Sequence, residues 1–228
     1  MSNTNDFGQP IGKELAGWAP PPMIPDGWLS GNHVRLRPLN VDDAAPVLSA
    51  LGQARHDLWT YMPFGPFHSL DDASGYLRYM VDQLDWRPYI IETTGLVQGF
   101  MAYLRIKPAD GVLEIGSIVF SPRLQRTTAA TESVYLMMRH AFDSGYRRVE
   151  WKCDSLHSVS RRAAERLGFR YEGTFVNATH YKGRSRDTAW FAVTAEEWPD
   201  RRRRLEAWLD PANFDREGNQ LRPLSSLD

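Results

Sequence analysis

The sequence predicts a mixed α+β fold, in which helices flank one central, twisted and mostly antiparallel sheet of about seven strands. Residues 114–120 are a short run rich in Ile and Val, the composition of a buried strand, and this run stops at Ser121-Pro122. A helical pattern follows, because apolar residues recur there at spacings of three and four, namely Val134, Met137, Met138 and Ala141. Two further strand-like segments meet at Thr94-Gly95, which is typical of a hairpin.

The other elements follow from local patterns in chain order. Alternation, β-branched content and turn residues predict strands at residues 33–37, 87–93, 96–106, 147–153, 169–179 and 186–193. Helices are expected from Asn40 or Asp42 towards Gln53, at residues 69–84 and 158–167, and from a capping box at Thr194 through Trp208. Gly168 should close the helix at 158–167 in a left-handed conformation.

The chain divides into three parts by composition. Residues 1–30 are rich in Pro and Gly and predict an arm, which should pack across the domain or across a neighbouring subunit. Residues 31–198 carry the predicted domain, and residues 199–228 are the end of the last helix and a tail. With 42% hydrophobic and 24% charged residues, the composition is that of an ordinary globular protein.

Charge and cysteine content exclude several classes of protein. The formal net charge of −1 gives no sign of a nucleic-acid binder. The single cysteine, Cys153, rules out an internal disulfide and argues against a zinc site. We found no apolar stretch of membrane length and no signal peptide, so we expect a cytoplasmic protein without a membrane partner or a bound metal.

The turn between the strand at 114–120 and the following helix is a candidate anion site. A helix start leaves backbone N–H groups unpaired and carries the positive end of the helix dipole, which together favour phosphate. Arg126 and the hydroxyls of Thr127, Thr128 and Thr131 could add donors. The alternative is that Thr127 or Thr128 simply caps an ordinary helix.

This turn and a second block downstream resemble the GCN5-related N-acetyltransferase (GNAT) superfamily, most closely its ribosomal-protein N-terminal acetyltransferase-like branch, from about His33 to Trp198. Residues 125–130 fill the place of the family's pyrophosphate loop, Gln/Arg-x-x-Gly-x-Gly/Ala, with Thr128 where the first glycine is expected. Residues 157–160, His-Ser-Val-Ser, match the family's Asn-x-x-Ser with His157 in place of the asparagine, and the family's usual Glu-Arg-Leu-Gly-Phe wording follows at 165–169.

The resemblance implies a binding site for acetyl-CoA between the strands at 114–120 and 147–153. The pantetheine arm would pair with the first strand, and a backbone N–H within residues 117–120, where the family has a β-bulge, would stabilise the oxyanion. The residues implied in cofactor binding are Ile118, Val119, Phe120, Gln125, Arg126, Thr127, Thr128, Ala129, Ala130, Thr131, His157 and Ser160.

The resemblance also implies two catalytic residues. Glu114 is the candidate base; the alternatives are an amine-binding group beside a water relay, or an ion pair with Arg105. Ser160 is the candidate proton donor to the thiolate, with Tyr171 as second choice, and the alternative is a first-turn hydroxyl that satisfies helix amides. His157 either holds the cofactor or has no role.

The predicted function is acetyl-CoA-dependent N-acetyl transfer to a primary amine, either a protein N-terminus or a small amine, by direct attack on the thioester. The alternative is an acyl-CoA-binding or sensing protein of the same fold with little or no turnover, because Thr128 and His157 depart from the cofactor motifs. A tryptophan-containing arm and a proline-bearing tail would suit a homodimer.

Overall fold

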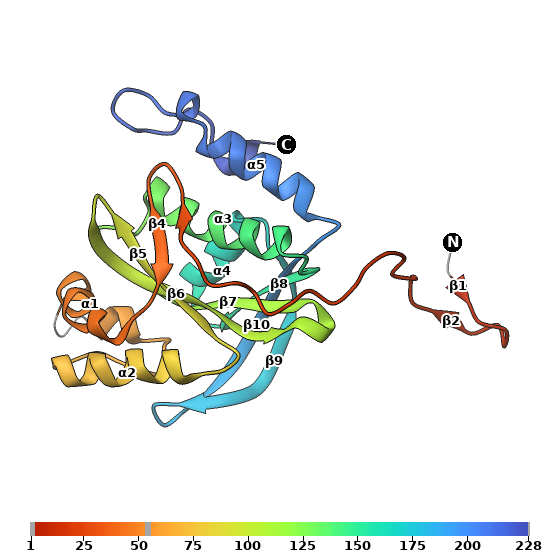
Figure 1. Ribbon diagram of the computed structural model, residues 1–228, viewed down its shortest axis with the longest axis horizontal. Helices are drawn as coiled ribbons and strands as arrows, with labels where there is room; N and C mark the ends of the chain where they lie inside the picture. The colour runs from red at the N-terminus through yellow and green to blue at the C-terminus, as the bar shows by residue number, and fades with distance from the viewer. Residues whose placement is uncertain (1–2, 53–55, 228) are drawn as a thin grey trace.

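The computed structural model describes residues 3–52 and 56–227, and its centre is an eight-stranded sheet with the order β3-β4-β5-β6-β7-β8-β10-β9 (Figure 1). Its strands are β3 (Leu29–Ser30), β4 (Arg35–Pro38), β5 (Arg87–Thr93), β6 (Leu96–Lys107), β7 (Val112–Phe120), β8 (Arg148–Asp154), β9 (Arg170–Tyr181) and β10 (Arg184–Thr194). Neighbouring strands are antiparallel except β7 and β8, which are parallel. The predicted mixed α+β class with a mostly antiparallel sheet is confirmed, and the two-residue β3 adds to the strands expected.

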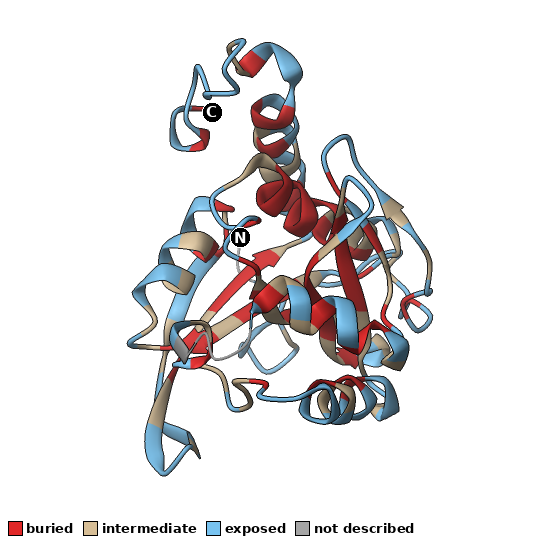
Figure 2. Ribbon diagram, turned by 90° about the vertical axis from the view of Figure 1, so that its left-hand side faces the viewer, coloured by how far each residue is buried: buried red, intermediate tan, exposed pale blue. Residues whose placement is uncertain are grey.

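Helices cover both faces of the sheet. They are α1 (Ala44–Leu51), α2 (Leu70–Asp82), α3 (Thr128–Asp143), α4 (Ser158–Arg166) and α5 (Trp198–Leu209). Alternate residues of β6 supply two separate cores: Phe100 packs with the α1 and α2 side, whereas Met101 packs with the α3, α4 and α5 side. Figure 2 shows the buried residues concentrated along the strands and on the inward sides of the helices. The period-two pattern of the strands therefore places one apolar set on each face.

Predicted helix ends agree with the structure in most places. Ser69 caps α2 by accepting the Asp72 N–H, and Gly168 follows α4 with a φ of +95°. At the last helix, the Glu197 carboxylate accepts the Thr194 N–H, which is one half of the predicted capping box. The Thr194 hydroxyl turns to Glu197 instead of to the helix amides, and α5 begins only after this turn.

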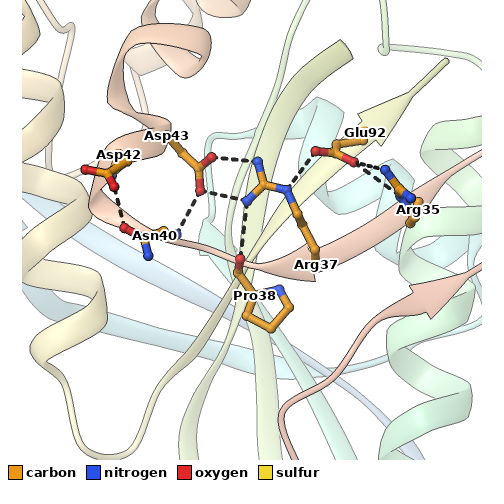
Figure 3. A network of polar contacts seen from close by, with 7 residues as sticks. All are labelled: Arg35, Arg37, Pro38, Asn40, Asp42, Asp43 and Glu92. Carbon is orange, nitrogen blue, oxygen red and sulfur yellow. Dashed lines mark hydrogen bonds and ion pairs between the residues drawn. The ribbon is translucent and has the colours of Figure 1, made fainter. Parts of the chain in front are cut away.

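A buried ion network fixes β4 to β5 and to the start of α1 (Figure 3). The Arg37 guanidinium lies 2.6 Å from an Asp43 carboxylate oxygen and 2.7 Å from Glu92, and Arg35 lies 2.9 Å from the other oxygen of Glu92. Asp43 also accepts the backbone N–H of Asn40. This network joins β4 to the turn before α1, six residues further along the chain, and to β5, 55 residues further along.

The two ends of the chain differ in how they pack against the rest of the protein. The short strands β1 (Asn3–Thr4) and β2 (Pro10–Ile11) form a hairpin that extends away from the sheet (Figure 1), whereas Ile24 is buried in the main core. At the other end, Leu224 and Leu227 are buried in the same core. No helix within residues 3–52 and 56–227 is long and apolar enough to cross a membrane.

Candidate active site

The site is a cavity at the place where β7 and β8 separate. The two parallel strands pair only at their beginnings, Val112–Glu114 with Arg148–Glu150. Beyond these pairs the strands diverge, and a cavity of about 320 Å³ is lined by residues of both, including Ile115, Ile118, Trp151 and Cys153. The edge of β7 that faces β8 therefore keeps backbone groups available for another extended group, which is the arrangement expected from the sequence.

A bulge lies at the middle of this free edge. The register between β6 and β7 shifts between the pairs Phe100–Val119 and Ala102–Gly116, and Ser117 has a φ of +50°. A positive φ is uncommon in a non-glycine residue. A contact with α2 supports it here, because the Ser117 hydroxyl lies 2.9 Å from the hydroxyl of Tyr76. A bulge is therefore present at residues 117 and 118, within the predicted range, and both residues line the cavity.

Glu114 lies in the cavity wall and is paired with two cations. Its carboxylate is 2.6 Å from the Lys152 ammonium and 3.7 Å from the Arg105 guanidinium. Burial raises the pKa of Glu114, while Lys152 and then Arg105 act in the opposite direction. The ion pair with Arg105 that the sequence allowed is present, but Lys152 is the closer partner. Nothing in the local sequence points to Lys152, which lies two residues after Glu150, the β8 residue that pairs with Glu114.

Ser160 and His157 reach the same cavity from the start of α4. The Ser160 hydroxyl accepts a hydrogen bond from the Trp151 indole N–H at 3.0 Å, so its own proton is not used in that contact. The His157 ring stacks on Tyr61 with centroids 4.5 Å apart, and burial lowers the pKa of His157. Burial therefore favours the uncharged form of the His157 ring, and Ser160 does not serve as a cap of α4. The second-choice acid, Tyr171, instead has its hydroxyl 2.8 Å from that of Thr174.

The predicted pyrophosphate loop forms the turn before α3. Thr127 caps the helix, because its hydroxyl accepts the Ala130 N–H at 3.2 Å and donates to the Leu124 carbonyl at 2.6 Å. The Thr131 hydroxyl accepts from Arg166, and the Gln125 amide donates to the carbonyl of Phe120. The alternative noted for Thr127 is therefore the contact that the structure shows. Of the predicted donors, the Thr127 hydroxyl donates within the protein, and the Thr131 hydroxyl accepts a hydrogen bond there.

Thr128 does not strain this turn. It is the first residue of α3, with helical backbone, and the positive φ in the loop is found at Arg126, with +63°. Because the backbone at Thr128 is helical and not left-handed, threonine is accommodated there without backbone strain. Ala129 and Ala130, the small residues that follow, are buried in the main core.

One side of the cavity is lined by aromatic residues that were not among the predicted site residues. The aromatic segment after Trp59 contributes Tyr61, Met62 and Phe64, and α2 contributes Tyr76 and Tyr79. The tip of the β9–β10 hairpin reaches this segment, because the Lys182 ammonium donates to the Trp59 carbonyl at 2.7 Å. The crowding of aromatic residues at 59–67 was the available signal, but a core flap would look the same. Within the described residues no group of three or more His, Cys, Asp or Glu side chains could hold a metal ion.

Comparisons with known proteins agree with this geometry. Residues 33–170 match the family model described as acetyltransferase (GNAT) domain. A GCN5-related N-acetyltransferase from Brucella melitensis is 38% identical, with 93% of this chain and 99% of that chain covered and a TM-score of 0.90. A probable acetyltransferase (GNAT family) from Chromobacterium violaceum is 36% identical, with 84% and 98% covered and a TM-score of 0.80.

More distant structures share the fold. Mycobacterium smegmatis RimJ in complex with CoA-disulfide is 24% identical, with 76% of this chain and 88% of that chain covered and a TM-score of 0.67. A search of curated proteins gave no match. The chain belongs to the acetyltransferase (GNAT) domain family. It is accordingly an acetyltransferase.

Proposed function

We propose that the protein transfers an acetyl group from acetyl-CoA to a primary amine, by direct attack of the amine on the thioester. The observation that carries this proposal is the cavity between β7 and β8, which Glu114, Ser160 and Ser117 of the bulge line together. An amine acceptor needs a base, the tetrahedral intermediate needs an N–H donor, and the thiolate that leaves needs a proton. Glu114, a backbone N–H at the bulge and Ser160 are proposed to supply these three groups.

Glu114 is the proposed base, acting directly or through one water. Its raised pKa brings a carboxylate closer to the range in which it can accept a proton from an amine. As the amine nitrogen bonds to the thioester carbon, the amine loses a proton towards Glu114 and the carbonyl oxygen becomes an oxyanion. A backbone N–H in residues 117–120 would stabilise that oxyanion. The free edge of β7, at Ile118, Val119 and Phe120, would pair with the pantetheine arm.

Ser160 is the proposed proton donor to the thiolate. When the carbon–sulfur bond breaks, the electron pair stays on sulfur, and a hydroxyl proton nearby neutralises it. Ser160 suits this role because the Trp151 indole N–H occupies an acceptor position of its oxygen and orients the hydroxyl. His157 would pack against the bound cofactor as a neutral ring, in the position stacked on Tyr61.

The turn before α3 is proposed to receive the pyrophosphate. The backbone N–H groups at residues 128 and 129 lie at the positive end of α3, and the exposed Arg126 stands beside them. CoA bound to the RimJ relative supports this ligand, since that protein has the same fold. The acyl-CoA-binding alternative without turnover is less well supported, because Thr128 does not distort the loop and both proposed catalytic groups face the cavity.

Calorimetric titration with acetyl-CoA, and with CoA for comparison, tests this proposal. We expect micromolar binding, roughly −8 kcal/mol. Arg126→Glu should weaken it about tenfold, since a charge-assisted contact to phosphate becomes repulsive. Arg203→Glu is the matched control, because Arg203 is an exposed arginine on α5 whose side chain is 71% exposed. Absence of binding to either ligand, or equal weakening by both variants, would contradict the proposed pyrophosphate site.

A further inference from the structure

Four aromatic side chains form a continuous wall along one side of the cavity. Phe64 stacks on Tyr76 with centroids 3.7 Å apart, Tyr76 lies 6.0 Å from Tyr79, and Tyr79 meets Trp86 edge-on at 5.7 Å. Tyr76 is mostly buried, whereas Tyr79 is 51% exposed. The wall therefore runs from the interior of the cavity to solvent, and we call these four residues the aromatic wall.

The inner end of the aromatic wall lies at the bulge of β7. The Tyr76 hydroxyl is 2.9 Å from that of Ser117, and Phe64, Tyr76, Glu114 and Ser117 line the same cavity. A flat apolar group that lies along the wall would consequently hold an amine attached to it close to the bulge and to Glu114. The aromatic wall is thus placed to orient an acceptor in the cavity.

The charges that line the cavity are balanced. Among the described lining residues the carboxylates are Glu114 and Asp154, and the cations are Lys152 and Arg186. Glu114 is paired with Lys152 at 2.6 Å, and Asp154 accepts the Tyr181 hydroxyl at 2.7 Å. The lining thus carries no excess negative charge, so a second ammonium group on an acceptor would lose its hydration without a net electrostatic gain. The lining is unfavourable for polycations.

The size of the cavity limits the acceptor further. Its volume of about 320 Å³ is near the lower end of the roughly 300–1,000 Å³ of small-molecule pockets. The acetyl thioester must share this space with the amine, because Ser160 and the strands β7 and β8 line it as well. The shared space therefore favours a compact group beside the amine.

We infer that the acceptor is a primary amine with a single uncharged aromatic group a few bonds from its nitrogen, and that polyamines and polycationic sugars are poor acceptors. This inference rests on the proposed function and specifies its substrate class. Two sources offer the same chemistry: a free arylalkylamine, and a peptide whose first residue is aromatic. Aromatic side chains pack well against such a group, and the aromatic wall consists of four aromatic side chains.

A comparison of acceptors tests the inference and separates its two sources. Release of CoA would be followed with 2-phenylethylamine, putrescine, spermidine, and tripeptides that begin with Phe, Asp or Lys. We expect kcat/KM for phenylethylamine or the Phe peptide to exceed that for putrescine and spermidine at least about tenfold. The better of the two aromatic acceptors identifies the source. A preference for putrescine, spermidine or the Lys peptide would overturn the inference.

Variants of the aromatic wall test its part directly. Tyr79→Ala should raise KM for the aromatic acceptor about tenfold and leave KM for acetyl-CoA nearly unchanged, whereas Tyr79→Phe should keep the parent KM. Val81→Ala is the matched control, since Val81 is 44% exposed on the same helix and is not among the described residues lining the cavity. Equal acceptor KM values for Tyr79→Ala and Val81→Ala would overturn the inference.

The two levels of the proposal fail in different ways. If acetyl-CoA binds but no amine is acetylated, the proposed function itself is wrong, and the inference falls with it. If amines are acetylated but the aromatic acceptors have no advantage, only the inference about the substrate class is wrong.

Discussion

Replacing Lys152 with methionine tests whether Glu114 is the group that accepts the proton. The Lys152 ammonium lies 2.6 Å from the Glu114 carboxylate, and the two side chains are only 16% and 7% exposed. Methionine keeps an unbranched apolar side chain and removes the charge. Burial raises the pKa of Glu114, and Lys152 is the strongest influence in the opposite direction. Removal of Lys152 must therefore raise the pKa of Glu114 further.

The consequence appears on the acidic side of the pH profile. A base must be unprotonated in the free enzyme, so kcat/KM falls as pH drops through its pKa. An opposite charge within about 4–6 Å typically changes the pKa of a carboxyl group by about 1–3 pH units. The midpoint of the acidic limb in Lys152→Met should move upward by a similar amount. The plateau at high pH should be retained, because Glu114 is ionised there in both proteins.

Arg105→Met provides a graded comparison. Arg105 is farther from Glu114, at 3.7 Å, and its side chain is 36% exposed, so solvent screens it more than Lys152. Its replacement should move the acidic limb in the same direction but by less. The assay is steady-state kcat/KM against pH, with circular dichroism to verify that each variant is folded. A folded Lys152→Met with an unmoved acidic limb would refute the assignment of Glu114 as the titrating base.

Two further predictions concern the proton donor and the fold. Ser160→Ala should lower kcat about ten- to a hundredfold while acetyl-CoA binds nearly as before, and an unchanged kcat would remove its role. Arg37→Met should lower the free energy of unfolding by about 3–5 kcal/mol, because it leaves the buried carboxylates of Asp43 and Glu92 without their main partner. Burial alone would raise the pKa of Glu92, but the arginine hydrogen bonds outweigh it and lower that pKa. The loss of unfolding free energy in Arg37→Met should hence be largest at neutral pH and should shrink as pH falls below the ordinary carboxyl range. Urea titrations at several pH values measure this loss. A loss that does not depend on pH would contradict the account.

Local patterns were sufficient for most of the fold. The strand at 114–120, the amphipathic helix after it and the hairpin at Thr94-Gly95 lie where the sequence predicted them, as β7, α3 and the turn between β5 and β6. These elements depend on periodicity and turn residues within a few positions of one another. The two-residue β3 could not be predicted in the same way, because pairing with β4 alone defines it.

The helix α3 buries a charged residue that its apolar pattern did not indicate. Glu132 is not among the apolar residues that define its predicted face, yet it is buried and accepts the backbone N–H groups of Asn32, His33 and Val34. The chain segment leading from β3 to β4 covers this side of α3, and nothing within the helix itself indicates that contact. A carboxylate that accepts three backbone hydrogen bonds is stable in such a place.

The family, the order of the elements, the turn before α3 and the candidates Glu114 and Ser160 could all be inferred from the sequence. The groups that surround these two residues are known only from the folded chain. The pairing of Glu114 with Lys152 depends on the register of β7 and β8 at the point where they part, and the aromatic wall depends on how the segment at 59–67 meets α2. Such contacts join residues far apart in the chain, so no local period or spacing encodes them.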